Sequence, residues 1–543
     1  MTEPTAVEFR GVGFRYGGDP VFEDVSFRLP EGEFCLLTGP TGSGKTTLLR
    51  MVDGLVPYFS GGTVTGSVTV GGREIRTTTP AENADLVGYV NQDPLAGFVT
   101  DDVVDELAFT AEQLAVPSAA IRKRLTEIMD LVGLAELRGR TLATLSAGQR
   151  QRVAIGAALT AGPRILVLDE PTSALDPAGA DEVLSILHRL VHDLGITVLL
   201  SEHRLERVIQ YADSGLVIRG TSVVAGALSD TLAGTDIAPP VVKLAEAADL
   251  RKADGGLPVT VRDTRRVAEA LRDRLDGTEP PHPRAEDAPI LAEVDGLCVD
   301  YKDFRAVDEV SLAVRRGQST ALTGRNGSGK SSLLWAVQGT GPRSGGRVSF
   351  DGTDPADLKP PARRALVGLV PSEPADLLYH ESVAAECAEA DGDSDAPAGT
   401  CEKIFHKMVT AEPGAVPPPA DASPRDLSEG QKLALALAVT LTAAPPLLLL
   451  DEPTRGLDYG AKGVLTALLH EHTAAGGAVL LASHDVEFIA EFADHVHLLS
   501  DGQTVAEGPA RDMMGASPMF APQVAKVLPG WMTVGEVEAA LDE

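Results

Sequence analysis

A chain of 543 residues is long enough for two large domains or for three or four smaller ones. Its 78 acidic and 47 basic residues give a formal charge of −31, which argues against a nucleic-acid backbone as the main partner, because phosphate binding needs clustered Lys and Arg. Apolar residues make up 43% of the chain, enough to bury sizeable cores and too many for general disorder.

The first elements of the chain read as strands. Residues 7–14 and 21–29 alternate apolar and polar side chains, with turn signals between them. The short apolar run FCLLTG follows them. We expect this run to be a strand that leads directly into the glycine-rich loop that comes next.

That loop, GPTGSGKTT, lies between an apolar strand and a helical pattern. Glycines let the backbone turn so that several N–H groups point at one phosphate, at the positive end of the next helix. Lys45 then reaches the β- and γ-phosphates of a nucleotide, and the Thr46 hydroxyl ligates magnesium. A coincidental glycine turn is the alternative. The predicted nucleotide-binding residues are Gly39, Pro40, Thr41, Gly42, Ser43, Gly44, Lys45, Thr46 and Thr47.

Two carboxylates follow a fully apolar run in ILVLDEP. Asp169 and Glu170 stand at the carboxyl end of this predicted strand, where ligands of open parallel sheets bind. We expect Asp169 to hold magnesium through water, and Glu170 to orient or activate the attacking water. A carboxylate pair that merely caps a strand is the alternative, which the upstream glycine loop weakens.

Four motifs occur twice in the same order, which indicates a duplicated domain. The pairs are GPTGSGKTT (39–47) and GRNGSGKSS (324–332), LSAGQ (145–149) and LSEGQ (427–431), ILVLDEPTSALD (165–176) and LLLLDEPTRGLD (447–458), and SEHRLE (201–206) and SHDVE (483–487). The spacing between copies is nearly constant, from 285 residues at the glycine loops to 281 at the histidines. Chance is therefore not a serious alternative.

The second copy carries the same residue types in the same roles. Strand-like alternation occurs at residues 291–299 and 306–314, and the run STALTG leads into the second glycine loop. Asp451 and Glu452 match the first acidic pair, with Asp451 and Ser331 as magnesium ligands. The nucleotide-binding residues predicted here are Gly324, Arg325, Asn326, Gly327, Ser328, Gly329, Lys330, Ser331 and Ser332.

The chain is predicted to hold two tandem α/β domains, because the later half of each copy alternates strand and helix patterns. We place the first domain at residues 1–229 and the second at 291–515. Residues 230–290 read as a linker with one or two surface helices, although an extension of the first domain is about as plausible. Residues 516–543 read as a proline-interrupted tail, with a short final helix from about Val534.

The sequence shows no clear pattern for a membrane span, a signal peptide, a disulfide framework or a zinc site. The longest strongly apolar runs, such as residues 447–450, are far shorter than the ~20 residues that cross a bilayer. Residues 1–10 lack the basic and then apolar pattern of a signal peptide. The four cysteines form no C-x-x-C pair, so we expect neither a disulfide framework nor a zinc site, and we predict a cytosolic protein with reduced thiols.

LSAGQ and LSEGQ, each a short way before LDEP, resemble the signature motif of ATP-binding-cassette (ABC) ATPases. The resemblance spans both copies but not the linker or the tail. It implies two cassettes, each with a mixed sheet core, an antiparallel β subdomain and a helical subdomain. The cassettes face each other head to tail and hold two ATP molecules with Mg²⁺ between them.

In that arrangement each signature caps the γ-phosphate held by the opposite glycine loop. The signature residues are Ser146, Gly148, Gln149, Ser428, Gly430 and Gln431. Ser146 and Ser428 begin predicted helices, whose N–H groups offer a second anion site. For a single such motif, an ordinary helix N-cap by serine is the alternative.

The resemblance also assigns residues outside these motifs. Gln92 in YVNQDP resembles the glutamine that reaches magnesium and senses the γ-phosphate. His203 and His484 resemble the switch histidine that contacts the γ-phosphate. A lone histidine after a strand is more often structural, but both of these follow their acidic pair at almost the same distance.

Two further resemblances concern a pair of tyrosines and a loop. Tyr16 and Tyr301 resemble the aromatic residue that stacks on adenine, although a tyrosine at a strand end usually has a packing role. Residues 173–176 and 455–458 resemble the loop that links the two sites.

The copies differ where YVNQDP of the first becomes LVPSEP in the second, so that Ser372 stands in place of glutamine. Serine is too short to play the same part without a shift. Residues 386–424 are rich in Ala, Pro, Gly and Asp, and they lack the firm helical pattern of residues 102–114. Glu373 or a water that replaces the glutamine is the alternative to a genuine difference.

We hypothesise unequal sites from this difference. The site that pairs Lys45 with Ser428 keeps Gln92 and is expected to hydrolyse ATP well. The site that pairs Lys330 with Ser146 lacks the glutamine and is expected to be slower.

Three features are similar to the energy-coupling-factor (ECF) importers for vitamins and metal ions. DVVDELAFTAEQL, from Asp102, resembles their V-x-D-E-x-A-F segment, and an amphipathic surface helix is the plain alternative. Glu-His-Arg around His203, in place of the commoner Thr-His-Asp, and the fusion of two cassettes also fit that group. The resemblance implies that a groove receives helices of an integral membrane coupling subunit, and that a second membrane subunit binds the substrate.

We therefore predict an ATP-hydrolysing importer subunit, peripheral at the cytoplasmic face of the cell membrane, whose closure drives separate transmembrane subunits. The alternatives are a soluble twin-cassette ATPase that acts on ribosomes and the ATPase of a peptide or sugar importer. A linker with prolines and mixed charge, in a strongly acidic chain, disfavours the ribosomal alternative. No nucleic-acid partner is expected.

Overall fold

The structure is a computed structural model, and it describes residues 4–280, 288–302, 304–411, 416–515, 517 and 520–542. The chain divides into two units: Met1–Glu246 with Arg251–Asp263, and Ala247–Leu250 with Thr264–Glu543. Each unit holds one copy of the repeated motifs, and the predicted linker contributes to both units. Residues 281–287 of that linker, and residues 516, 518, 519 and 543 of the predicted tail, lie outside the described residues.

An antiparallel sheet opens the first unit, with strand order β2-β1-β4-β5. Its strands are β1 (Thr5–Arg15), β2 (Phe22–Pro30), β4 (Thr63–Val70) and β5 (Arg73–Glu74). The strands predicted at residues 7–14 and 21–29 are thus confirmed. The rings of Phe9 and Phe27 stack on the buried face with their centroids 4.5 Å apart, so this face contributes to the main apolar core of the unit.

The central sheet of the first unit has the order β10-β9-β3-β8-β7-β6. Its strands are β3 (Phe34–Thr38), β6 (Val87–Val90), β7 (Ile165–Asp169), β8 (Thr197–Ser201), β9 (Ser214–Arg219) and β10 (Ser222–Gly226). All neighbours pair in parallel except β9 and β10. Every residue of β3, β7 and β8 is buried, as expected for parallel strands that are covered on both faces.

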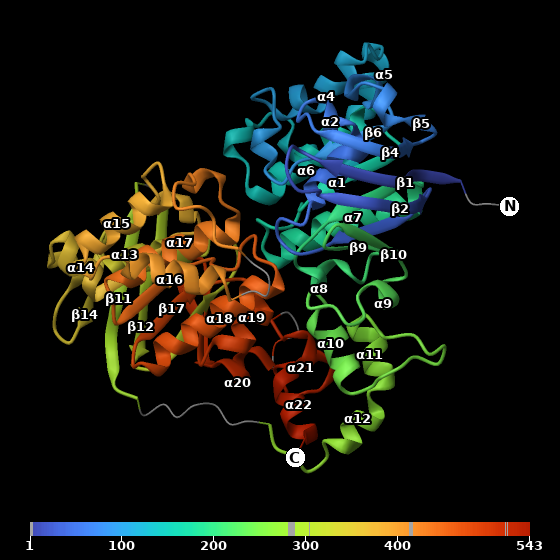
Figure 1. The fold of residues 1–543 in the computed structure, drawn as a ribbon. Helices are drawn as coiled ribbons and strands as arrows, with labels where there is room; N and C mark the ends of the chain where they lie inside the picture. The colour runs from blue at the N-terminus through green and yellow to red at the C-terminus, as the bar shows by residue number, and fades with distance from the viewer. Residues whose placement is uncertain are drawn as a thin grey trace. The chain divides into compact units, whose positions relative to one another are not determined.

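Helices cover this sheet, and a separate helical group stands beside it. α1 (Lys45–Asp53) packs against β6 and β7, whereas α4 (Val103–Gln113) and α5 (Ser118–Leu131) pack against α6 (Ala147–Thr160) (Figure 1). The helix expected from Asp102 is therefore confirmed as α4. The other helices of this unit are α2 (Leu55–Tyr58), α3 (Pro80–Asn83), α7 (Pro177–Leu194), α8 (Leu205–Val208) and α9 (Leu228–Thr231).

The second unit repeats this plan. One antiparallel sheet has the order β12-β11-β14, and the central sheet has the order β15-β16-β17-β13-β18-β19. The strands are β11 (Ile290–Tyr301), β12 (Phe304–Arg315), β13 (Ser319–Thr323), β14 (Gly345–Phe350), β15 (Val367–Val370), β16 (Leu447–Asp451), β17 (Ala478–Ala482), β18 (His495–Ser500) and β19 (Gln503–Pro509). The predicted fold of two α/β cassettes, each with a mixed central sheet, an antiparallel sheet and a helical group, is confirmed.

The helical group of the second unit is better formed than its sequence suggests. α15 (Val383–Asp393) and α16 (Thr400–Val409) pack against α17 (Glu429–Thr442), although residues 386–424 lack a firm helical pattern. Phe405 is fully buried among them (0% exposed), and Asp391 accepts hydrogen bonds from the N–H groups of Gly399 and Cys401, which link the two helices. Tertiary packing compensates here for weak local pattern.

The remaining helices of the second unit are α13 (Lys330–Gln338), α14 (Pro360–Leu366), α18 (Tyr459–Ala474), α19 (Val486–Phe492), α20 (Ala510–Gly515), α21 (Gln523–Val527) and α22 (Val534–Asp542). The last helix begins at Val534, as predicted. Among the described residues, none of the helices combines the length and the apolarity that a membrane span requires.

Three short helices occupy the predicted linker: α10 (Pro240–Ala247), α11 (Val261–Val267) and α12 (Glu269–Arg274). In the second unit the end of the linker is joined to the tail. Nε of Arg265 donates to the carbonyl oxygen of Lys526, and Nη2 of Arg272 donates to that of Val527 at 3.3 Å. These two arginines satisfy carbonyl groups at the end of α21, which would otherwise lack helical partners.

We predict that Phe405→Ala destabilises the helical group of the second unit by about 3–5 kcal/mol, since it leaves a cavity in a packed core. Hydrogen–deuterium exchange measured by mass spectrometry should show faster exchange in peptides that cover α15 and α16. The control is Tyr379→Ala, because the Tyr379 side chain is 81% exposed. Equal exchange in the two variants would show that residues 383–409 do not form a packed core.

Candidate functional site

The central sheet of the first unit gathers three motifs at one edge. β8 lies between β3 and β7, and all three strands run parallel. The glycine loop leaves the carboxyl end of β3, the acidic pair lies at the end of β7, and His203 follows β8. Because the carboxyl ends of parallel strands meet at the same edge, motifs that are far apart in the sequence share one site.

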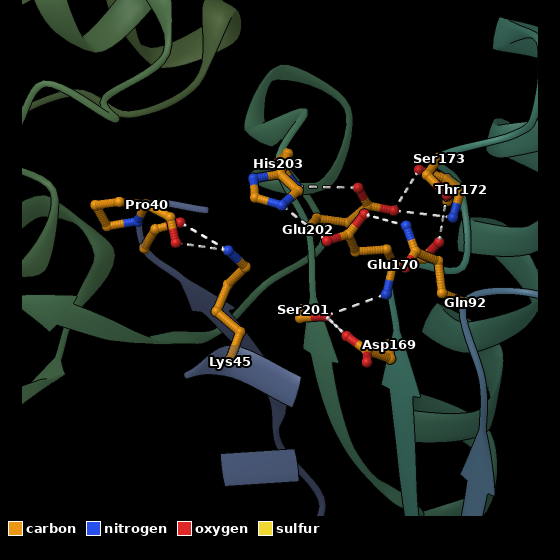
Figure 2. Close-up of polar contacts among 11 residues, drawn as sticks. Pro40, Lys45, Gln92, Asp169, Glu170, Thr172, Ser173, Ser201, Glu202 and His203 are labelled. Atoms are coloured by element: carbon orange, nitrogen blue, oxygen red, sulfur yellow. Dashed lines mark hydrogen bonds and ion pairs between the residues drawn. The ribbon is translucent and has the colours of Figure 1, made fainter. Parts of the chain in front are cut away.

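The first glycine loop has the backbone that phosphate binding requires. Gly44, at the N-cap of α1, has φ = +100°, and a Cβ atom there would come within 2.7 Å of the Val21 side chain. The Nζ atom of Lys45 donates to the carbonyl oxygens of Gly39 and Pro40 at 2.9 and 3.0 Å, so its ammonium group folds over the loop (Figure 2). The Oγ atom of Ser43 is buried and has no hydrogen-bond partner among the described residues.

The second glycine loop repeats these features. Gly329 has φ = +98° at the N-cap of α13, and Lys330 donates to the carbonyl oxygens of Gly324 and Arg325 at 2.9 and 3.1 Å. Ser328, the counterpart of Ser43, likewise has a buried Oγ atom without a partner among the described residues. Two such hydroxyls beside a positive side chain and a helix N-terminus fit an anionic ligand such as a nucleotide phosphate.

The acidic pair of the first unit is fixed by the neighbouring strand. Asp169 and Ser201 are paired in register, and the Ser201 hydroxyl donates to Asp169 Oδ1 at 2.7 Å. The N–H of Glu170 donates to the carbonyl oxygen of Ser201 at 3.1 Å. Glu170 has φ = +47°, and its counterpart Glu452 has φ = +48°, a conformation that bulky residues seldom adopt. Strain of this kind persists only where surrounding contacts hold it, as they do here.

Glu170 is the centre of the first site, as Figure 2 shows. Its Oε1 lies 2.7 Å from Nε2 of His203, and its Oε2 accepts a hydrogen bond from Nε2 of Gln92 at 2.9 Å. Burial disfavours the charged form of Glu170, but the hydrogen bond and charge of His203, with the charge of Lys45, hold its pKa below the ordinary value. The structure thus keeps an ionised carboxylate at this place.

The second site brings together the matching residues. Oε2 of Glu452 lies 2.7 Å from Nδ1 of His484. Burial raises the pKa of Asp451 to about 6, and a hydrogen bond with Ser331 acts in the opposite direction. These two predicted magnesium ligands are therefore in contact. Oδ1 of Asp451 has no hydrogen-bond partner among the described residues, which fits a hard cation.

The two sites differ where the sequences differ. Gln92 contacts Glu170 in the first unit, whereas the structure records no hydrogen bond for Ser372 among the described residues of the second. The neighbouring Glu373 forms an ion pair with Arg455, the first residue of the loop after the second acidic pair. Glu373 is therefore directed at that loop and not at Glu452.

The predicted adenine-stacking tyrosines have different surroundings. The hydroxyl of Tyr16 lies 3.1 Å from Oγ1 of Thr47, so this half-exposed ring lies beside the first glycine loop and its helix. Tyr301 is similarly exposed at the end of β11, but no side-chain hydrogen bond or ring contact of Tyr301 occurs among the described residues. The structure brings Tyr16, but not Tyr301, to a glycine loop.

The two signature motifs begin helices in the same way. Ser146 caps α6 and Ser428 caps α17, each in a capping box with the glutamine three residues later. Each serine side chain accepts from the N–H of that glutamine at 3.3 Å. The local geometry is that of a well-capped helix, which leaves the first N–H groups at the positive end of the helix. Pairing of each signature with the opposite glycine loop stays a prediction.

Glu202 and the ion pair between Lys462 and Asp485 are functional candidates that the sequence motifs do not predict. All three side chains are buried; Glu202 and Asp485 adjoin His203 and His484 in the chain, and Lys462 pairs with Asp485. The available signal was a charged residue directly beside each histidine, Glu202 before His203 and Asp485 after His484. The partners of these charged side chains are seen only in the folded structure, where Glu202 contacts Thr172 and Asp485 contacts Lys462.

A groove of about 240 Å³ opens in the first unit between the end of α1 and the helices α4 and α6. Its lining includes Asp53, Asn91, Phe98, Glu106 and Ala157. Glu106 is fastened to the preceding loop, because it accepts hydrogen bonds from the N–H groups of residues 99 and 100 at 3.0 and 2.8 Å. The Asp53 side chain has no hydrogen bond or ion pair among the described residues, and burial raises its pKa to about 7.

We predict that Asp53→Asn stabilises the first unit more at pH 8 than at pH 5.5. The folded-state pKa of Asp53 lies above that of the unfolded chain, so its ionisation costs stability increasingly as pH rises between these values. The difference between the two pH values should be on the order of 2 kcal/mol. Thermal or denaturant unfolding at both pH values measures it. A benefit that is independent of pH would contradict the account.

Comparisons with known proteins agree with this geometry. The family model described as "ABC transporter" matches residues 22–173 and 307–455. A Streptomyces avermitilis protein named "Putative ABC transporter ATP-binding protein" is 50% identical over 570 residues, covering 98% of this chain and 100% of its own. A protein of the same name from Methanosarcina mazei is 30% identical over 564 residues, with 97% and 95% covered.

A solved complex of an archaeal ribosome recycling factor with a ribosomal stalk protein covers 93% of this chain and 91% of its own, with a TM-score of 0.57 and 20% identity. At that identity the likeness concerns the fold alone. The matched family model spans both glycine loops and both acidic pairs, and the relatives named for ABC transport span nearly the whole chain. This chain therefore belongs to the ABC transporter family, and it is an ATPase with two fused cassettes.

Proposed function

We propose that this ATPase powers a membrane importer of the ECF type, and that its two cassettes enclose two ATP molecules and pass their closure to separate transmembrane subunits. The observation that carries the proposal is the groove of the first unit. Its wall includes α4, the helix formed by the V-x-D-E-x-A-F segment, and Asn91, whose neighbour Gln92 contacts Glu170. A segment bound in the groove is thus one residue away from the hydrolytic site.

The residues of the first site supply distinct parts of the hydrolysis step. Lys45 and the loop N–H groups hold the β- and γ-phosphates. Glu170, kept ionised, orients and polarises the attacking water, and His203 is placed to contact the γ-phosphate. Bound Mg²⁺, held by Thr46, Asp169 and Gln92, would neutralise phosphate charge. Tyr16 stacks on the adenine.

The second site uses the matching residues, with Lys330 on the phosphates, Glu452 at the water and His484 at the γ-phosphate. Ser331 and Asp451 hold the metal ion. Glu373 is paired with Arg455, and within the part of the chain that the structure describes no side chain takes the place of Gln92, so this site hydrolyses ATP more slowly. The cassettes pair head to tail, so Ser146, Gly148 and Gln149 face the second glycine loop, and Ser428, Gly430 and Gln431 face the first.

The groove also indicates the chemistry of its occupant. Asp53 presents a buried carboxyl group that no described side chain pairs with, and Phe98 and Ala157 present apolar surface. A short helix with an apolar face and one basic side chain fits such a lining, because an ion pair restores the charged form of Asp53. An integral membrane subunit supplies this helix on the cytoplasmic side, and a second membrane subunit binds the vitamin or metal ion.

We predict that affinity purification from solubilised membranes recovers an integral membrane protein with this chain. Ala157→Trp fills the groove and should abolish the recovery, since a helix no longer fits, while binding of a fluorescent ATP analogue is retained. Ala119→Trp is the matched control, because Ala119 is exposed on α5 and does not line the groove. Recovery of ribosomal proteins without any integral membrane protein would contradict the proposal and favour an ATPase that acts on ribosomes.

We predict unequal effects of removing the two glutamates. Glu170→Gln should lower the steady-state ATPase rate of the full chain by about 10²-fold or more, because the more active site loses its base. Glu452→Gln should lower it by about threefold or less, since the second site contributes little. Steady-state hydrolysis with saturating Mg-ATP measures both. Equal losses would refute the inequality of the sites.

A further inference from the structure

A second buried carboxylate lies beside the first site. Glu202 is 1% exposed and lies between Ser201, the last residue of β8, and His203. Its Oε1 accepts from the backbone N–H of Thr172 at 2.9 Å and from the Thr172 hydroxyl at 2.5 Å, and its Oε2 accepts from the N–H of His203 at 3.2 Å (Figure 2). Three donors thus surround a carboxylate that would be costly to bury without them.

These contacts complete a closed ring around Glu170. His203 contacts the Glu170 carboxylate at 2.7 Å, and the Ser173 hydroxyl donates to the Glu170 carbonyl oxygen at 3.0 Å. Thr172 precedes Ser173, and Glu202 precedes His203, so the bonds between Glu202 and Thr172 join the two segments that hold Glu170. A second contact joins the same segments farther along the chain, where Nη1 of Arg207 donates to the carbonyl oxygen of Leu175 at 3.2 Å, whereas Glu202 is bonded to the residue directly before Ser173.

The second unit lacks this carboxylate and has another link. Ser483 occupies the position of Glu202, and among the described residues its Oγ accepts a hydrogen bond from the N–H of Asp485, at 3.0 Å. Asp485 instead pairs with Lys462 of α18, at 2.7 Å, with both side chains buried. The first-copy counterparts of Lys462 and Asp485 are Ala180 and Arg204, which cannot form that pair. Each unit therefore fastens its histidine segment to the chain after its acidic pair, with different charged groups.

We propose that Glu202 is a positioning residue of the first site, which holds His203 at Glu170 by fastening the histidine segment to Thr172. The inference rests on the proposed role of Glu170 at the attacking water. None of the three hydrogen bonds of Glu202 involves the glycine loop at residues 39–47. Loss of Glu202 should therefore affect the hydrolysis step and leave ATP binding nearly unchanged.

Glutamine at this position separates the hydrogen-bond role from size. Glu202→Gln keeps the shape of the side chain, but one acceptor oxygen becomes an NH₂ group. Whichever way the amide turns, that group meets a backbone N–H, either of His203 or of Thr172. Thr172→Val removes the hydroxyl donor from the other end of the link, with little change in volume.

The test is ATPase kinetics of the full chain with Glu202→Gln, Thr172→Val and both together. We expect Glu202→Gln to lower kcat about tenfold, with KM and the affinity for a fluorescent ATP analogue within about twofold of the unmodified chain. Thr172→Val should lower kcat in the same direction. Because both changes break one link, the double variant should lose no more than Glu202→Gln alone.

Ser483→Ala is the matched control in the second copy and should stay within about twofold of the unmodified chain, since the hydrogen bond of the Ser483 side chain that the structure describes stays within its own loop. Additive losses in the double variant, a rise in KM that accounts for the loss, or an unchanged kcat in folded Glu202→Gln would each overturn the proposal. If thermal unfolding shows that Glu202→Gln does not fold, Thr172→Val decides alone, and an unchanged kcat overturns the proposal.

The proposed role of Glu170 is judged separately. Hydrolysis at the unmodified rate by Glu170→Gln would reject that role, whereas the double-variant comparison would still report whether Glu202 and Thr172 act as one link.

Discussion

The chemistry of each unit depends on buried parallel strands that lie side by side. β3, β8 and β7 carry side chains that are hidden from water along their whole length, so their register is set by apolar packing on both faces. A shift of one residue between β7 and β8 would separate Asp169 from Ser201 and turn Glu170 away from His203. The polar site is therefore held by an apolar framework.

On that framework the two units use different polar contacts. The first has Gln92 on Glu170 and Glu202 on Thr172, whereas the second has the Glu373–Arg455 and Lys462–Asp485 ion pairs. Duplication preserved the strands and the loops that hold phosphate, but the side chains that tie the loops together diverged. Within the proposed function, this divergence lets one site turn over ATP while the other mainly contributes to binding.

The groove and the site are connected through one short segment. Asn91 lines the groove, Gln92 contacts Glu170, and Glu106 of α4 holds the loop that follows. Movement of an occupant in the groove would shift Gln92 relative to Glu170 without any long pathway. The buried carboxyl group of Asp53 makes the same groove sensitive to the charge of what enters it.

The amino-acid sequence predicts the duplication, the α/β class, the opening strands, α4, the final helix and the motifs of the glycine loops and acidic pairs. These features are written in short stretches of chain, where the pattern of apolar residues and the positions of glycine act over a few neighbours. The contacts of Glu202, Lys462, Asp485 and Glu373, and the packed helices within residues 383–409, emerge from the three-dimensional fold and could not be predicted. Their partners lie 23 to 82 residues away and are brought near by strand register and core packing, which no local pattern encodes.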